Sequence, residues 1–112
     1  MGMTVTTSNG SRDSEGNLDW IYDPVEVDGD AIGLSWSASA MSVCDALVAA
    51  NIAEENQMIS GLEMPIKEAD DKLQAALTRV DPEDDYLVPR LIAIDRVIRT
   101  GLSHGATHLI AD

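Results

Sequence analysis

The chain has 112 residues, of which twenty are Asp or Glu and seven are Lys or Arg, so its formal net charge is -13. A chain of this length forms one domain with a modest core, and because it has no Phe, that core must be built largely from aliphatic side chains. Binding to nucleic acid or to an anionic membrane requires Lys and Arg to displace counterions, so this charge argues against both as direct partners.

The acidity has two interpretations. The scarcity of Lys, the preference for Asp over Glu and the small apolar side chains resemble proteins of halophiles that accumulate salt, because molar salt screens surface self-repulsion. Alternatively, an acidic surface imitates nucleic acid and occupies the basic groove of a partner protein. A mimic would collect its acids on one face, whereas a salt-adapted surface distributes them, and in this sequence they recur from Asp13 to Asp112.

Cysteine usage and hydropathy indicate a compartment. Cys44 is the single cysteine and has no Cys or His at metal-ligand spacing, so we interpret it as a small apolar residue in a reduced environment. The N-terminal residues contain no apolar run of signal-peptide type, and no stretch approaches the roughly 18 apolar residues of a membrane span. We therefore expect a soluble protein of the cytoplasm or of a virus particle, neither secreted by a signal peptide nor inserted in a membrane.

The fold class predicted from these patterns is α+β: an extended N-terminal arm, a β-hairpin and three helices that pack antiparallel. Residues 1–17 are mostly Ser, Thr, Gly, Asn and charged residues, with too little apolar surface to fold alone. We expect them to form a flexible arm, followed by a single small domain over residues 18–112.

Residues 18–40 predict the β-hairpin. Residues 18–27 and 31–40 favour extended structure and flank Asp28-Gly29-Asp30, a strong turn signal. Pro24 cannot donate to a ladder, so the first strand is an edge strand or is interrupted there. The acids of residues 23–33 also raise the alternative of a calcium loop. Such a loop needs acidic side chains at alternate positions, and Pro24 interrupts this pattern.

Residues 42–61 predict the first helix, with Ser42 and Asp45 as a capping box and Gly61 as its stop. Asn51 and Glu55 fall inside its apolar arc, so they lie at the solvent edge of the arc or need buried partners. The opposite side is rich in alanine, which reflects helix propensity or lets a second layer approach closely. These alanines are Ala46, Ala49, Ala50 and Ala53.

Two further helices have clearer amphipathic patterns. Pro65 suits the first position of a helix that extends to Val80, and Glu68 and Lys72 form a favourable i,i+4 pair. A third helix follows Asp81-Pro82, with three acids in its first turn and Gly101 as its left-handed stop. Its apolar stripe is Leu87, Leu91, Ile94 and Ile98, and Ile92 lies on the opposite face.

The tail carries the one candidate metal site. His104, His108 and Asp112 share a face if the tail is a continuous helix, with the two His suitably spaced for a divalent metal. Gly105 weakens such a helix, and residues 106–111 also fit a short strand that joins the hairpin. We predict no other cofactor and find no catalytic motif.

The function expected first is that of a non-catalytic subunit of a multichain assembly of the virus-particle, connector or appendage type, salt-adapted and homo-oligomeric. Its partners would be other protein chains, contacted through Ala46, Ala49, Ala50, Ala53, Ile92 and Trp36. The alternatives are an acidic regulator or nucleic-acid mimic that binds a basic partner protein, and a metal-dependent enzyme that uses His104 and His108.

Overall fold

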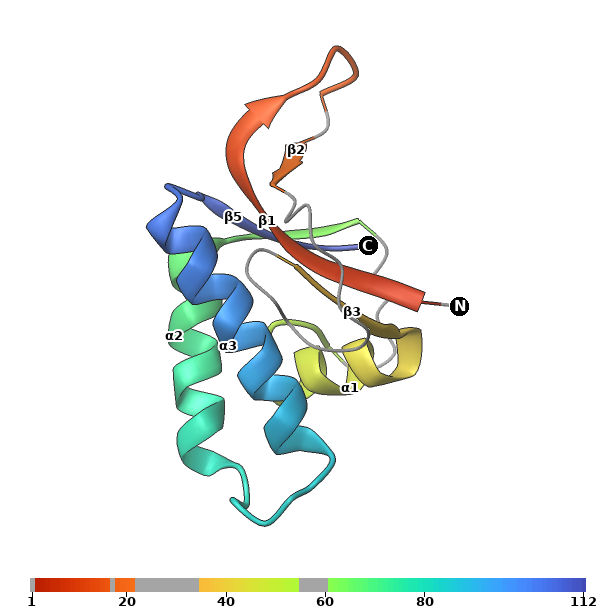
Figure 1. Cartoon of the computed structure of the whole chain (residues 1–112), viewed down its shortest axis with the longest axis vertical. Coiled ribbons are helices and arrows are strands. Elements are labelled where there is room, and N and C mark those ends of the chain that lie inside the picture. Colours follow the sequence, from red (N-terminus) through yellow and green to blue (C-terminus); the bar gives the residue numbers. More distant parts are fainter. Residues whose placement is uncertain (1, 17, 22–34, 55–60) are drawn as a thin grey trace.

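The computed structural model describes residues 2–16, 18–21, 35–54 and 61–112, which form an antiparallel sheet with three helices packed on one face (Figure 1). The predicted α+β class with three helices is therefore confirmed. The elements in chain order are β1 (Gly2–Arg12), β2 (Leu18–Ile21), β3 (Ser35–Ser39), α1 (Ala40–Ala49), β4 (Leu62–Pro65), α2 (Ile66–Arg79), α3 (Leu87–Ser103) and β5 (His108–Ala111).

The N-terminal segment is the inner strand of the sheet and not a free arm. Residues 5–8 of β1 pair with β5 along one edge and with β3 or β2 along the other. Its predicted extended conformation is confirmed, and residues 2–12 pair within the sheet instead of standing apart from the domain. Thr and Ser suit a strand that is paired on both sides, because its backbone groups are satisfied and its small hydroxyl side chains fit between neighbours.

Strands β2 and β3 lie one after the other along the same edge of β1. Ile21, the last residue of β2, is opposite Thr7, and Ser35, the first residue of β3, is opposite Thr6. In the described residues, β2 and β3 pair with β1 and not with each other, so the hairpin that the structure shows joins β1 to β2. The predicted turn at Asp28-Gly29 and the alternative calcium loop lie outside the described residues.

Residues alternate between the two faces of the sheet. Val5 of β1, Trp36 of β3 and Leu109 of β5 belong to the buried core on the helical face. Ser35 and Ser37 point to the opposite face, as expected for a half-solvated strand. The tail therefore forms a strand, β5, between β1 and β4, rather than a helix.

Helix α1 begins and ends earlier than predicted. Its N-cap is Ser39, whose Oγ accepts a hydrogen bond from the backbone N–H of Ser42, so the capping residue is three positions before the predicted one. The helix ends at Ala49 because Asn51 adopts a left-handed conformation, with φ 57°. The N–H groups of Asn51 and Ile52 bond to the carbonyls of Val48 and Leu47, which is the Schellman pattern.

Helix α2 matches its predicted pattern. Its buried residues are Ile66, Ala69, Leu73 and Ala76. Pro65 immediately precedes the helix, and the Glu68–Lys72 pair is present at 3.9 Å. Lys72 and Arg79 also donate hydrogen bonds to the carbonyls of Asn51 and Ala49, where α1 leaves C-terminal carbonyls without intrahelical partners. These two cations tie α2 to the end of α1.

Helix α3 continues past its predicted stop. Gly101 lies inside the helix, where a Cβ atom would approach Thr7 of β1 to 2.6 Å, so its role is close packing. The left-handed residue is Gly105, with φ 77°. The N–H of Gly105 bonds to the carbonyl of Leu102, and the N–H of Ala106 bonds to that of Gly101. These bonds form a Schellman motif about one turn later than a stop at Gly101 would.

Candidate functional site

The predicted metal ligands are separated by the end of α3. His104 caps the helix and its Nδ1 lies 2.9 Å from the carbonyl O of Thr100, whereas His108 lies in β5 with Nδ1 2.8 Å from Thr107 Oγ1. Asp112 follows the same strand at its far end. Because the chain turns at Gly105 and becomes extended, the i, i+4, i+8 helical relation does not exist. Within the described part of the chain, no three His, Cys, Asp or Glu side chains are grouped to hold a metal.

Most of the predicted interface residues are used inside the chain. Ala46, Ala50, Ala53 and Trp36 are buried in the chain's own core. In this structure these four side chains pack inside the chain, and their predicted contact with a partner stays a prediction. The reason is that α1 packs on the sheet and on α3 at once, so both sides of the helix are covered. Ala49 is half-buried and packs against the core, while Ile92 is 40% exposed as predicted.

Most of the cationic side chains are engaged within the molecule. Lys72 and Arg99 form ion pairs on α2 and α3, Arg99 with both Asp70 and Asp95. Arg79 donates to a backbone carbonyl, as described above, and Arg12 pairs with Glu63. No Lys or Arg occurs between Arg12 and Lys67, whereas eleven of the twenty acidic residues lie in that interval. The sequence between these two cations therefore carries negative charge only.

A dense group of acids lies where α2 connects to α3, at the lower end of the molecule in Figure 1. Asp81, Glu83 and Asp85 are exposed, and Asp84 is half-buried. Asp84 Oδ1 accepts hydrogen bonds of 3.0 and 2.8 Å from the backbone N–H groups of Tyr86 and Leu87, so this carboxylate caps α3. The acids thus precede the helix, instead of forming its first turn as predicted.

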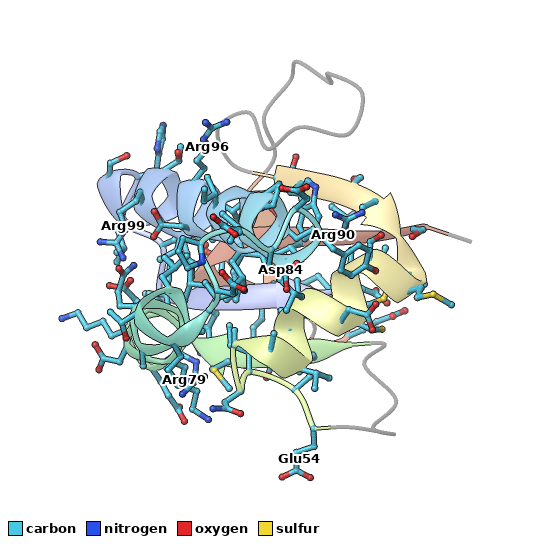
Figure 2. All side chains as sticks on the ribbon, turned by 90° about the horizontal axis from the view of Figure 1, so that it is seen from below. Glu54, Arg79, Asp84, Arg90, Arg96 and Arg99 are labelled. Carbon is cyan, nitrogen blue, oxygen red and sulfur yellow. The ribbon has the colours of Figure 1, made fainter. Side chains whose placement is uncertain are left out.

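Tyr86 joins this connection to α1. Its hydroxyl donates to Asp45 Oδ2 at 2.6 Å, and the Arg90 guanidinium stacks 3.9 Å from the centre of its ring. Arg90 also donates to the carbonyl O of Tyr86 and reaches Ser42 Oγ of α1 at 3.4 Å. Figure 2 views this end directly, with Asp84 and Arg90 close to the centre.

We call this group the acidic end: Asp45, Asp81, Glu83, Asp84, Asp85 and Tyr86. It combines fixed carboxylates with a tyrosine that is 41% exposed and has Arg90 stacked on its ring. Charge-assisted hydrogen bonds from Lys or Arg and stacking of a guanidinium on Tyr86 are the contacts that such a surface can make. The run of acids is visible in the sequence, but the contribution of Asp45, 41 residues away along the chain from Tyr86, is not.

The remaining acids are not collected on the same side. Asp13 and Glu15 lie in the turn after β1, at the opposite end of the long axis, and Glu68 and Asp71 are exposed on α2. The described acids are therefore spread over several parts of the surface, and the acidic end is the part where they lie closest together in the sequence.

Among the described residues, no helix combines the length and the apolar character needed to cross a membrane. No family model, curated protein or solved structure matches this chain.

Proposed function

We propose that this chain is a non-catalytic protein-binding module that docks its acidic end on a basic surface of a partner protein. The observation that carries the proposal is the acidic end itself, where the α2–α3 connection and α1 present fixed carboxylates around a partly exposed tyrosine. This is the acidic-regulator alternative of the sequence analysis. We prefer it to the assembly subunit because the arm and the alanine face that supported an assembly are built into the chain's own core.

Several features of the acidic end suit recognition more than mere solubility. Asp84 is held by two backbone hydrogen bonds and Tyr86 by a hydrogen bond to Asp45, so little side-chain freedom is lost on binding. The net charge of -13 attracts a cationic partner from a distance and raises the association rate, an effect that salt suppresses. Arginine-rich partners are favoured over lysine-rich ones because a guanidinium both pairs with carboxylates and stacks on an aromatic ring.

The test is a binding titration with poly-arginine as the basic probe, comparing the wild type with the double variant Glu83→Gln/Asp85→Asn. Both residues are exposed, and neither caps α3, so the fold should be retained. Two exposed ion pairs are worth about 0.4–2 kcal/mol together, so we expect affinity to fall by roughly two- to thirtyfold at 0.1 M KCl.

The matched control is Glu15→Gln/Asp71→Asn, which removes the same charge from exposed positions outside the acidic end. The proposal expects this control to bind nearly as well as the wild type. If both double variants lose affinity equally, the probe responds to net charge alone and the acidic end is not a specific site.

A second candidate, the subunit of a multichain assembly, is favoured by one observation: Met41 at the start of α1 is 73% exposed and Ile92 of α3 is 40% exposed. A single exposed aliphatic side chain is common on the surface of a monomeric protein. Light scattering at 0.15 and 2 M KCl distinguishes the candidates. A dimer or larger species that Met41→Gln or Ile92→Gln dissociates would support assembly, whereas a monomer at both salt concentrations would exclude homo-oligomerisation.

A further inference from the structure

The β1–β2 hairpin bends away from the sheet on the side that the helices do not cover (Figure 1). Strand β1 changes register between Ser8 and Arg12, and Gly10 adopts φ 87° at that point. The Ser8 carbonyl is held by the backbone N–H of Thr107 at 2.7 Å, so the strand is fixed up to the bend. Beyond the bend, the hairpin projects from the sheet on the side away from the helices (Figure 1).

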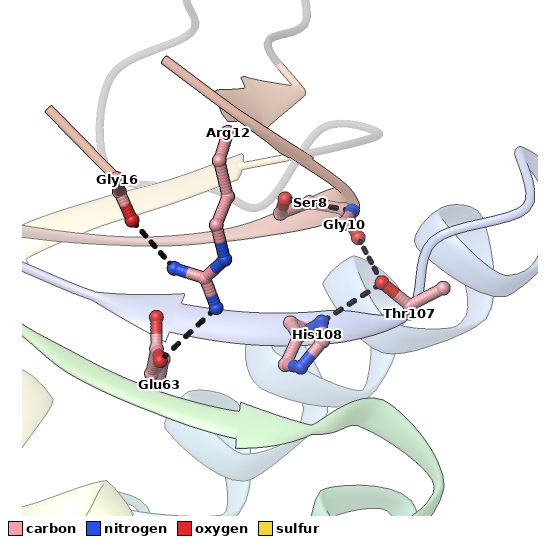
Figure 3. A network of polar contacts seen from close by, with 7 residues as sticks. All are labelled: Ser8, Gly10, Arg12, Gly16, Glu63, Thr107 and His108. Atoms are coloured by element: carbon pink, nitrogen blue, oxygen red, sulfur yellow. Dashed lines mark hydrogen bonds and ion pairs between the residues drawn. The ribbon is translucent and has the colours of Figure 1, made fainter. Parts of the chain in front are cut away.

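One side chain shows how far the hairpin bends. Glu63 of β4 is opposite Ile110 of β5, which is opposite Thr6 of β1, so Glu63 is level with Thr6. Arg12 lies six residues further along, and a straight strand would carry it about 20 Å past that level, beyond the reach of both side chains. The Arg12 guanidinium nevertheless lies 3.7 Å from Glu63 Oε1, crossing β5 as Figure 3 shows.

The same guanidinium holds the hairpin together. Arg12 donates to the carbonyl O of Gly16 in the turn at 2.6 Å, so a single side chain connects the turn of the hairpin to the edge strand β4. Thr6, Ser8 and Ile110 are buried, although all three point to the face opposite the helices. Among the strand residues whose side chains are described, Ile110 is the one buried aliphatic residue on the face opposite the helices.

We infer that the hairpin is a salt-sensitive strap, held in its bent position beside the outer face of the sheet by the Arg12–Glu63 ion pair. Both side chains are 48% exposed. Attraction between exposed charges is weak and is screened over about 3 Å at 1 M salt, compared with about 10 Å at 0.1 M. Raising the salt concentration, or neutralising either partner, therefore shifts the hairpin towards an open position in which Arg12 is no longer held at Glu63. An exposed pair changes such an equilibrium by at most about fivefold.

The experiment measures paramagnetic broadening in the full chain by NMR. A nitroxide is attached at Ser14→Cys, in the exposed turn, in a Cys44→Ala background that removes the native thiol. In the closed state, at 0.1 M KCl, the label should broaden the amide signals of Glu63 and Ile110. The variant Glu63→Gln should reduce this broadening, and 2 M KCl should reduce it in the parent protein to the level of the variant.

The matched control is Glu68→Gln, which removes a comparably exposed ion pair, that with Lys72, from α2. It should leave the broadening of Glu63 and Ile110 unchanged. Equal broadening in the parent and in Glu63→Gln, or an equal response of both to salt, would overturn the inference, because the hairpin would then be held by contacts other than this ion pair.

Discussion

Adding one methyl group at Gly101 tests the contact between α3 and the inner strand of the sheet. A Cβ atom at this position would lie 2.6 Å from Thr7 Cγ2, 2.7 Å from Thr7 Oγ1 and 2.9 Å from Thr7 Cβ. Thr7 is fully buried, and its backbone pairs with β2 on one side and β5 on the other, so it cannot retreat without disturbing three strands. Gly101→Ala therefore introduces overlap that the structure cannot easily relieve.

The expected loss follows from two opposed contributions. Overpacking a core costs about 1–3 kcal/mol, and three contacts below 3.0 Å place this site at the upper end. Replacing glycine by alanine inside a helix recovers about 0.8–1 kcal/mol. The net destabilisation of Gly101→Ala is then about 1–2 kcal/mol, which lowers the melting temperature by roughly 5–10 °C.

Urea unfolding followed by circular dichroism measures this difference, with Arg96→Ala on the exposed face of α3 as the control, expected within about 0.5 kcal/mol of the wild type. Thr7→Ala should restore part of the stability of Gly101→Ala because it removes two of the three overlapping atoms. Alone it should cost little, since Thr7 Oγ1 has no hydrogen-bond partner among the described residues. A Gly101→Ala protein as stable as the wild type would refute the reasoning.

Three other predictions concern the strand, the cap and the charge. Val5→Ala, at a fully buried position of β1, should cost about 2 kcal/mol in urea unfolding, and an unchanged midpoint would mean that the N-terminal strand is not part of the core. Asp84→Ala should cost about 0.5–2 kcal/mol by removing the α3 cap, while Asp85→Ala should stay within about 0.5 kcal/mol; equal losses would contradict the capping role. Finally, the melting temperature should rise between 0.1 and 2 M KCl because salt screens the self-repulsion of a net charge of -13, and equal values would speak against salt adaptation.

The helices could be predicted where local pattern and packing agree. The buried residues of α2 and the i,i+4 pairs of α2 and α3 are those that the helical period indicates. The stop signals were less reliable, because a glycine is needed both for a left-handed cap and for close packing. Gly101 and Gly105 are four residues apart, and only the position of Thr7 decides which of them serves which purpose.

The strand β1 and the acidic end depend on long-range neighbours. A segment such as residues 2–12, rich in Ser and Thr, has the composition of a flexible arm, and it becomes the inner strand only because β5, from the other end of the chain, pairs with it. Likewise, the alanine side of α1 could pack on another molecule or on α3, and sequence periodicity cannot distinguish these. Asp45 joins the acidic end through Tyr86, a contact that no local pattern indicates.

The most direct test of the proposed function is a map of the bound surface. Titrating the isotopically labelled chain with poly-arginine at 0.1 M KCl should shift the amide signals of residues 81–86 and of Asp45 first and most strongly, and 1 M KCl should reverse the shifts. Equal shifts at the turn around Asp13 and along α2 would contradict the account, because the chain would then attract cations through its overall charge, without a defined docking surface.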